Sequence, residues 1–532
     1  MALFLTAQVL AHRAYPFDND EAAHAVPALL MLRELQAGDL VGFAREVYDQ
    51  NFYPPGAAVI MIPAYLLAGP SPAVARLASI GALLGALLVL FALARQIDPD
   101  RGAAAGLIAV VLTLTARPLL INSGLAMLEA PGLLVCLLAL WAYARATRRP
   151  SAAVLSLVGV LLAAAFLTKY TYGLVTLAAI GLSELVEAIN RRDGTGLLKR
   201  WSLMFAPFLL LMAIWFIRPG QLAAFVDYMR PLDSDSSWVA PANGLYYLRS
   251  FALHSAPSPY FALVNLAAVL WAFTAWRDAA IRAVLLYLLL GLAAVMLVNH
   301  PPNPRFITTF VPAAQLLTGL MIVRLWSRRA PDGPGTKQPG KVFRLAILAV
   351  VSLIGLTVLP TVYARYVNYS TLFEARLETS PELAGMADWI AATAPADGTI
   401  FLINMWDQFG PQQLAWEIAR QTGAPPPRVI ARVLEPASPA NTAALAAEMA
   451  AENASALVLI EGSPWGAPFW PDYTAALEAN LQQLDRREFR LTSYAVSDWL
   501  DENSLVGNDW EALREQSQEQ LAINVILYDF RQ

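Results

Sequence analysis

Residues 73–94 read AVARLASIGALLGALLVLFALA, a stretch whose only charge is Arg76. A helix needs roughly 20 mainly apolar residues to cross a membrane. The stretch therefore predicts a membrane-spanning helix, and similar stretches recur along the first two thirds of the chain. We expect spans over residues 73–94, 103–121, 127–146, 151–168, 171–189, 202–217, 260–276, 281–298, 306–326 and 343–362.

The composition of the whole chain agrees with a membrane protein. Of its 532 residues, 57% are hydrophobic and 15% are charged, whereas soluble domains carry about 45–50% apolar and about 25% charged residues. This balance excludes a secreted disulfide scaffold, a disordered chain and an ordinary cytosolic enzyme. Cys136 is the single cysteine, so one chain can form neither a disulfide nor a cysteine-based zinc cluster.

The distribution of charge divides the chain near residue 362. Residues 1–362 hold 27 Lys and Arg against 18 Asp and Glu, whereas residues 363–532 hold 10 Arg, no Lys and 23 Asp and Glu. We therefore predict a helical membrane domain over 1–362 and an acidic, soluble α/β domain over 363–532. In the second domain we expect strands over 399–404, 456–460, 489–494 and 523–528, and helices over 411–422, 440–451, 473–484 and 510–521.

The basic residues of the first domain predict its orientation, because cytoplasmic loops of membrane proteins carry an excess of Lys and Arg. Alternate short loops hold 17 basic residues, so we expect these loops in the cytoplasm. Loops 12–72, 117–128, 218–259 and 299–305, together with the C-terminal domain, then face outward from the cytoplasmic membrane. The basic residues are Arg95, Arg101, Arg145, Arg148, Arg149, Arg191, Arg192, Lys199, Arg200, Arg277, Arg282, Arg324, Arg328, Arg329, Lys337, Lys341 and Arg344.

The first outer loop, residues 12–72, is the richest in reactive side chains. It carries Asp20, Glu21 and His24 at the predicted start of a helix, followed by an amphipathic stretch over 25–37 that we expect at the membrane surface. An apolar stretch over 56–68 contains a proline and suits an interfacial or re-entrant segment. A solvated acidic loop closed by a proline turn is the plainer interpretation.

Further polar residues are predicted at the outer ends of the spans, at the same face. Ionisable groups at such depths are costly and tend to mark function, although Lys and Arg near helix ends also reach the interface without further purpose. Two acidic positions and several cations on one face suggest a site for an anionic head group beside a general base. The residues are Asn122, Glu129, Lys169, Arg218 and Arg305.

The order of short motifs resembles the GT-C superfamily of membrane glycosyltransferases. The nearest groups are the protein O-mannosyltransferase, aminoarabinose-lipid A transferase and rhizobial lipopolysaccharide galacturonosyltransferase families, and the resemblance covers residues 1 to about 330. The matching residues are Asp20-Glu21, Gly38-Asp39, Tyr53-Pro54-Pro55, Ala75-Arg76-Leu77, Glu129, Thr168-Lys169 to Gly173, and Pro304-Arg305-Phe306.

This resemblance implies a GT-C-like fold with about 10–11 transmembrane helices and an inverting sugar transfer from a polyprenyl-phosphate donor to an acceptor hydroxyl. By analogy, Asp20 is the general base, while Glu21, Glu129 and His24 orient the base or the acceptor. Lys169 and Arg305 hold the lipid phosphate. The acceptor is a lipid, glycan or protein, and we expect no nucleic acid.

Two departures from the family pattern bear on the site. Several family members place Lys or His before the Pro-Pro turn, where this chain has Tyr53, which can donate a hydrogen bond to phosphate but supplies no charge. Residues 1–11 are apolar but make only half a span, so we expect the end of a first helix or a peripheral helix.

Two other classes of protein stay open as alternatives. A transporter or flippase for lipid-linked sugars would also carry polar spans, but it usually buries charge near the midplane and often shows repeated halves. A non-catalytic sensor or scaffold with an outer ligand-binding domain would leave the charged cluster without a purpose. The four histidines show no metal-ligand spacing, so we predict no cofactor, with a divalent metal left open. They are His12, His24, His254 and His300.

Overall fold

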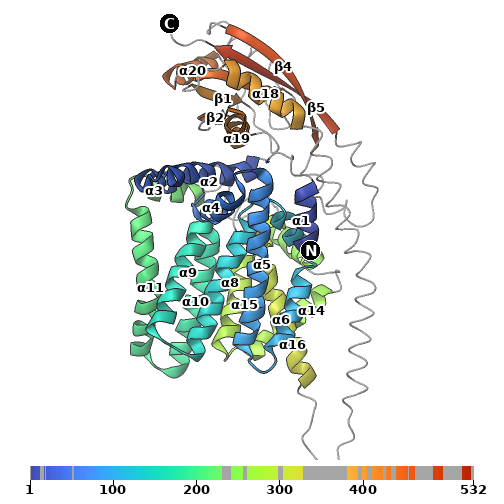
Figure 1. The fold of residues 1–532 in the computed structure, drawn as a ribbon. Helices are drawn as coiled ribbons and strands as arrows, with labels where there is room; N and C mark the ends of the chain where they lie inside the picture. The colour runs from blue at the N-terminus through green and yellow to red at the C-terminus, as the bar shows by residue number, and fades with distance from the viewer. Residues whose placement is uncertain are drawn as a thin grey trace, which may run out of the picture. The chain divides into compact units, whose positions relative to one another are not determined.

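The computed structural model describes residues 2–11, 17, 19–50, 53–229, 241–255, 261–297, 304–327, 380–393, 398–403, 410–422, 427–432, 439–452, 454–461, 483–494 and 518–528. The chain divides into two compact units (Figure 1). The first comprises Met1–Ala7, Asp39–Ala64 and Arg76–Val367, and the second comprises Gln8–Gly38, Tyr65–Ala75 and Asn368–Gln532. The predicted domain boundary at residue 362 lies outside the described residues and stays a prediction.

The first unit is a bundle of helices. Among the described residues, five helices are long and apolar enough to cross a membrane: α5 (Pro72–Ile97), α8 (Glu129–Arg148), α10 (Tyr170–Arg191), α11 (Gly194–Phe216) and α15 (Ala279–Leu297). The other helices are α1 (Ala2–Ala11), α3 (Leu40–Tyr48), α4 (Gly56–Ala68), α6 (Gly102–Thr113), α7 (Arg117–Ser123), α9 (Ala152–Thr168), α12 (Gln221–Met229), α13 (Pro241–His254), α14 (Phe261–Thr274), η1 (Pro304–Ile307) and α16 (Val311–Ser327).

The predicted membrane-protein class is confirmed, and helices occupy the expected spans that the structure describes. One expected span, 103–121, is wrong as a continuous helix: α6 ends at Thr113 and α7 begins at Arg117. Pro118 explains the break, because proline suits the first turn of a helix and disrupts an interior. Residues 306–326 begin in the short η1 rather than in α16. The expected span 343–362 lies outside the described residues.

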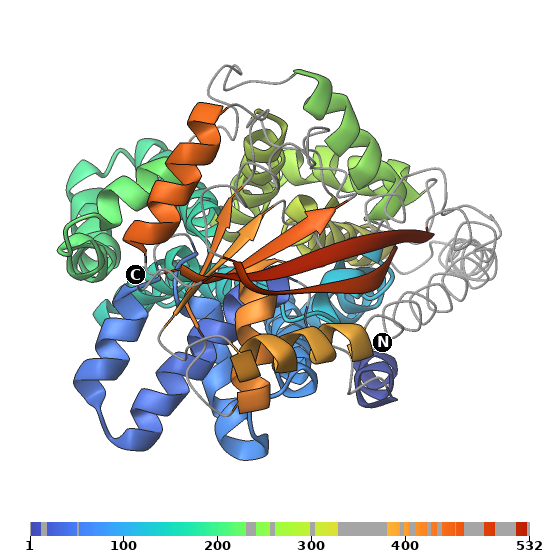
Figure 2. The same cartoon turned by 90° about the horizontal axis from the view of Figure 1, so that it is seen from above.

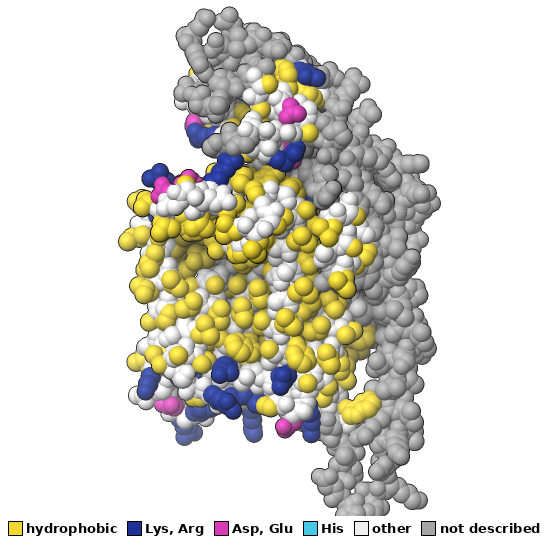
Figure 3. All heavy atoms as spheres, in the orientation of Figure 1, with side chains coloured by type: hydrophobic (Ala, Val, Ile, Leu, Met, Phe, Trp, Pro, Cys, Tyr) yellow, Lys and Arg dark blue, Asp and Glu magenta, His cyan; other side chains and the backbone are white. Residues whose placement is uncertain are grey.

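The basic loops of the first unit meet at one end of the bundle. Figure 3 shows a hydrophobic band over the bundle with Lys and Arg side chains along its lower edge. Side-chain contacts tie the loops together and establish that they share this end. These contacts run from Arg148 to the carbonyl of Ile97, from Arg200 to Glu184, from Arg282 to Glu187 and from Arg324 to Asp98.

The second unit contains a five-stranded sheet in the order β2-β1-β3-β5-β4, with the first three strands parallel and the last two pairings antiparallel. A core of apolar side chains joins α18 and α19 to one face of this sheet, and Figure 2 shows α20 across the sheet from them. The elements are α18 (Ser380–Thr393), β1 (Thr399–Ile403), α19 (Pro411–Thr422), β2 (Val429–Arg432), α20 (Pro439–Ala451), β3 (Ala454–Glu461), β4 (Gln483–Tyr494) and β5 (Gln518–Tyr528).

The α/β character of this part of the chain is as expected, with differences in detail. Residues 518–521 were expected at the end of a helix, but they begin β5, where they pair with β4. The rest of that expected helix, and residues 473–482 of another, lie outside the described residues. The short β2 and α18 were not expected. β2 is only four residues long, too short for an alternating pattern to stand out.

Helix α2 (Asn19–Ala37) also belongs to the second unit. It begins beside Asp20 and Glu21, as the sequence predicts. The expected amphipathic pattern is wrong: from residue 21 to residue 32 most side chains are buried, on all sides of the helix. Packing against α19 explains part of this burial, and the Phe17 ring, just before α2, contacts Trp416 of α19 with ring centroids 4.8 Å apart.

Candidate active site

Glu129 and Lys169 lie at the end of the bundle opposite the basic loops. Glu129 is the first residue of α8, and Lys169 separates α9 from α10 in an extended conformation, with φ −155° and ψ 125°. This break lets the two helices reverse direction at Lys169, as the sequence predicts. Both side chains are buried, Glu129 at 2% and Lys169 at 7% exposure. Charges this deep need partners.

The two charges face each other, with Lys169 Nζ 3.9 Å from Glu129 Oε1. The other carboxylate oxygen, Glu129 Oε2, is buried and accepts no hydrogen bond from any residue that the structure describes. A buried carboxylate oxygen without a donor is costly. It is therefore a natural acceptor for a hydroxyl group of a ligand or for a water molecule.

Aromatic rings hold the cations of the site. Lys169 Nζ lies 4.8 Å from the centroid of Tyr172 and 5.1 Å from that of Phe306, and its ammonium lies 3.5 Å from the Tyr172 hydroxyl. The Arg305 guanidinium lies 5.3 Å from the same Phe306 ring. One ring thus contacts both cations, which brings Lys169 and Arg305 together. Such contacts are worth about 2 kcal/mol or more when desolvated.

Two glycines of the bundle allow the rings of Tyr172 and Phe310 to pack closely against its helices. A Cβ on Gly132 would lie 2.4 Å from Cδ2 of Tyr172, and a Cβ on Gly291 would lie 2.3 Å from Cδ1 of Phe310. Phe310 follows the η1 segment that carries Arg305, and it also meets Tyr287 edge to face at 5.2 Å. The glycines of α8 and α15 therefore allow Tyr172 and the η1 segment to approach the bundle.

The turn that contains Tyr53 is anchored beside Lys169. Tyr53 is half-buried and Pro54 and Pro55 are buried. A Cβ on Gly56, the first residue of α4, would lie 2.6 Å from both the carbonyl oxygen of Leu167 and the hydroxyl of Thr168. Only glycine permits this approach, so the Pro-Pro turn and the end of α9 are neighbours. The role of Tyr53 stays a prediction.

The predicted acidic residues of the first outer loop lie in the second unit. Asp20 is half-buried in the first turn of α2, Glu21 is fully buried and His24 is 5% exposed. Asp20 and His24 are four residues apart, which places them on one side of the helix. Their roles stay predictions.

Two of the predicted polar residues, Asn122 and Arg218, form contacts with residues outside the Lys169 cluster. Asn122 donates from Nδ2 to the Pro118 carbonyl at 2.7 Å and to the Thr308 hydroxyl at 3.4 Å, so it braces the segment after η1. Arg218 forms an ion pair with Asp49 at the end of α3. Neither contact places the residue in the Lys169 cluster.

Tyr172 and Phe306 were not assigned roles from the sequence. Both signals were present: Tyr172 follows Lys169 by three residues in the first turn of α10, and Phe306 follows Arg305 directly. Tyr172 is only three residues from Lys169, so its proximity could have been foreseen, but the contact of Phe306 with Lys169 joins distant parts of the chain.

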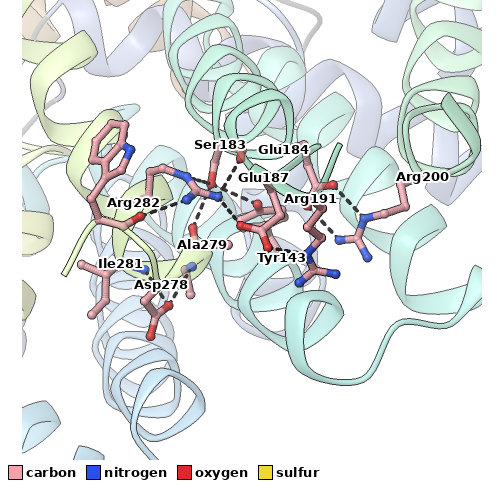
Figure 4. A network of polar contacts seen from close by, with 12 residues as sticks. Tyr143, Ser183, Glu184, Glu187, Arg191, Arg200, Asp278, Ala279, Ile281 and Arg282 are labelled. Carbon is pink, nitrogen blue, oxygen red and sulfur yellow. Dashed lines mark hydrogen bonds and ion pairs between the residues drawn. The ribbon is translucent and has the colours of Figure 1, made fainter. Parts of the chain in front are cut away.

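A second charged network lies at the basic end of the bundle (Figure 4). Arg282 is fully buried and donates to the Ser183 carbonyl and to Glu187, both at 2.9 Å, and Arg200 donates to both oxygens of Glu184. Each of these guanidinium groups pairs with a carboxylate, so the network joins α10, α11 and α15. We assign it to packing.

The described residues contain no group of three or more His, Cys, Asp or Glu side chains that could hold a metal ion. His12 and His300 lie outside the described residues.

Comparison with known proteins finds a family model and solved structures to which the chain is similar. Residues 53–217 match the family model described as dolichyl-phosphate-mannose-protein mannosyltransferase. The fold is similar to ArnT from Cupriavidus metallidurans, both bound to undecaprenyl phosphate and in the apo state, with a TM-score of 0.57 for each. The chain is thus similar to a mannosyltransferase family over residues 53–217, and its fold is that of ArnT.

The similarity to individual proteins is distant. The two ArnT structures are 16% and 18% identical to this chain, and the matches cover 98% of this chain and 96% of theirs. The oligosaccharyltransferase of Archaeoglobus fulgidus matches with a TM-score of 0.51 and 12% identity, over 86% of this chain and 67% of that one. No curated protein sequence matches the chain.

Proposed function

We propose that the protein transfers a sugar from a polyprenyl-phosphate donor to an acceptor hydroxyl at the end of the bundle that holds Lys169. The observation that carries the proposal is the cluster of buried Lys169 and half-buried Arg305 on the Phe306 ring beside Glu129. Two cations at the depth of lipid head groups suit a lipid phosphate. The ArnT structure of the same fold holds undecaprenyl phosphate, which supports a donor of this class.

The cations also suit the leaving group. When the bond between the sugar carbon and the phosphate oxygen breaks, the electron pair stays on that oxygen, and its charge is stabilised by positive groups already in place. Polyprenyl phosphate leaves as an anion, so no general acid is required. Lys169 and Arg305 are proposed to hold this phosphate, and Tyr53 to donate a hydrogen bond to it.

A carboxylate base completes the proposed reaction. The acceptor hydroxyl must lose its proton as its oxygen attacks the sugar, and we propose that Asp20 accepts this proton. Attack opposite to the leaving phosphate inverts the configuration at the sugar carbon. Glu21 and His24 are proposed to orient the base, and Glu129 Oε2 to accept a hydrogen bond from a hydroxyl of the bound sugar or acceptor. No cofactor is proposed, and a divalent metal stays open.

We propose that this end of the bundle faces outward from the cytoplasmic membrane. The structure gathers the basic loops at the other end, and such loops are retained in the cytoplasm. The donor then binds from the outer leaflet. The acceptor is proposed to be a lipid, glycan or protein on that side.

The proposed function is tested by offering donors to the purified protein in lipid. We expect it to release sugar from at least one member of a panel of radiolabelled polyprenyl-phosphate sugars, by transfer to lipid extract or by slow transfer to water. Nucleotide sugars, which lack the prenyl chain, should give no product. Use of a nucleotide sugar with no use of any polyprenyl-phosphate sugar would overturn the donor class.

Gly132→Ala should weaken donor binding about tenfold. The new methyl group would overlap the Tyr172 ring, so the ring must move. The contact between this ring and Lys169 is then lost. Overpacking of this kind costs about 1–3 kcal/mol. Gly81→Ala in α5 is the matched control, since its Cβ would meet no atom within 4 Å. Donor affinity is measured by competition with polyprenyl phosphate. Equal affinity of the two variants would show that Tyr172 does not position Lys169.

A further inference from the structure

A pocket of about 520 Å³ lies between α3 and the end of α11, lined by Arg45, Tyr48, Asp49, Ile217 and Arg218. Helix α3 lies across the end of α11 (Figure 1). The Tyr48 hydroxyl donates to the Ile214 carbonyl at 2.9 Å, and its ring stacks on Trp215 at 5.7 Å. These contacts hold α3 in place, so the pocket belongs to a fixed part of the fold.

Among the described residues that line the pocket, two are cations and one is a carboxylate. Arg218 forms an ion pair with Asp49, and both side chains are 40% exposed. Arg45 is exposed and forms no side-chain ion pair with any residue that the structure describes. Two guanidinium groups against one carboxylate give the pocket a net positive charge, and guanidinium groups bind phosphate oxygens in a bidentate manner.

A stripe of exposed apolar side chains leads along α11 to this pocket. Leu210, Ile214 and Ile217 are 63%, 49% and 77% exposed, and their spacing of four and three residues places them on one side of the helix. The stripe extends about 10 Å along the helix axis at 1.5 Å per residue. The hydrocarbon core of a membrane is about 30 Å thick, so one leaflet is about 15 Å, and the stripe covers most of that thickness.

We infer that the pocket binds the phosphate head group of an anionic phospholipid whose acyl chain lies along the Leu210, Ile214 and Ile217 stripe. The phosphate contacts Arg45 and Arg218, at the level where α11 leaves the hydrocarbon. An apolar surface that ends in a pair of cations matches a lipid better than a second protein chain, which would need a matching anionic patch beside its own apolar face. This site is distinct from the Lys169 cluster.

The lipid would also act on the candidate active site. Helix α3 leads, within a few residues, to the Tyr53-Pro54-Pro55 turn that packs against Thr168. A lipid that holds α3 against α11 therefore holds this turn. The effect on activity rests on the proposed function, whereas lipid binding itself does not.

The test measures lipid binding by the purified full-length protein in neutral detergent, using native mass spectrometry to count bound lipid. The probes are phosphatidylglycerol, phosphatidylcholine and inorganic phosphate. We expect one tightly bound phosphatidylglycerol, with weaker binding of phosphatidylcholine. Arg45→Gln should weaken phosphatidylglycerol binding about tenfold or more, because it removes a charged donor. Arg101→Gln, at an exposed arginine at the opposite end, is the control.

Arg218→Gln is a second variant and should weaken binding further, since it leaves Asp49 without its cation. Among the described residues Arg45 has no carboxylate partner, so Arg45→Gln keeps the fold, and the test stays decisive if Arg218→Gln does not fold. Equal phosphatidylglycerol affinity for wild type, Arg45→Gln and Arg101→Gln would overturn the site. Inorganic phosphate binding as tightly as the lipid, or a dimer that forms through α11 without lipid, would overturn the lipid assignment. None of these readouts requires sugar transfer, so the site can fail while the proposed function holds.

Discussion

Asp20→Asn is expected to lower the rate of sugar transfer by a hundredfold or more, with donor affinity near that of the wild type. A positioned general base is typically worth about 10²–10⁴ in rate, and an amide cannot accept the proton of the acceptor hydroxyl. Turnover and donor affinity are measured separately on the same preparation, with the most active donor of the panel.

Stability distinguishes this role from a structural one. Asp20 lies in the first turn of α2, where a carboxylate stabilises the helix by about 0.3–1 kcal/mol through the helix dipole. Asn keeps the size of the side chain, so the thermal unfolding midpoint should change by no more than a few degrees. A purely structural Asp20 predicts that small change in midpoint and no comparable loss of rate.

Glu21→Gln is the neighbouring control and should lose less activity than Asp20→Asn. If Asp20→Asn keeps near-full turnover while Glu21→Gln loses it, the base is Glu21 and the motif is shifted by one residue. If both variants stay active, the first outer loop holds no base and the proposed mechanism is wrong.

The second large effect is expected at Lys169. Removal of a charged donor to a buried anion costs about 1.5–3 kcal/mol, so Lys169→Ala should weaken the binding of polyprenyl phosphate by one to two decades. The matched control is Lys199→Ala, because Lys199 is exposed near the start of α11, at the basic end of the bundle. Affinity for polyprenyl phosphate is measured by equilibrium binding in lipid nanodiscs.

Two further variants keep this prediction decisive. Lys169→Ala leaves Glu129 as a buried carboxylate without its cation, so the double variant with Glu129→Gln removes that charge and should still bind weakly. Arg305→Ala should lose affinity to a similar extent, because its guanidinium shares the Phe306 ring with Lys169. Equal affinities for Lys169→Ala, Arg305→Ala and Lys199→Ala would remove both cations from the phosphate site.

The parts of the fold that follow from local pattern were predictable. Long apolar runs identified the spanning helices, because length and hydropathy are properties of each segment alone. The break between α6 and α7, and the start of β5 at Gln518, were missed for the opposite reason. The first depends on where a single proline falls in a helix turn, and the second on pairing between β5 and β4.

The side of the membrane on which the candidate site lies could be predicted from the topology of the helices. Once the basic loops were assigned to one side, Glu129, Lys169 and Arg305 had to fall on the other, and the structure brings them together. The rings that hold the cations were not predicted, since Phe306 approaches Lys169 across more than a hundred residues of chain. The amphipathic expectation for α2 failed in part because α19, far along the sequence, packs against it.

The most direct test of the central claim follows both halves of the donor in one reaction. Purified wild-type protein in sealed vesicles is given a polyprenyl-phosphate sugar labelled in the sugar and in the phosphate, together with a lipid extract as acceptor. A glycosyltransferase releases one polyprenyl phosphate for each sugar that appears on the acceptor, and this one-to-one release is the predicted result. Movement of the intact donor across the vesicle membrane, with the bond between sugar and phosphate unbroken, would contradict the account and show a transporter instead.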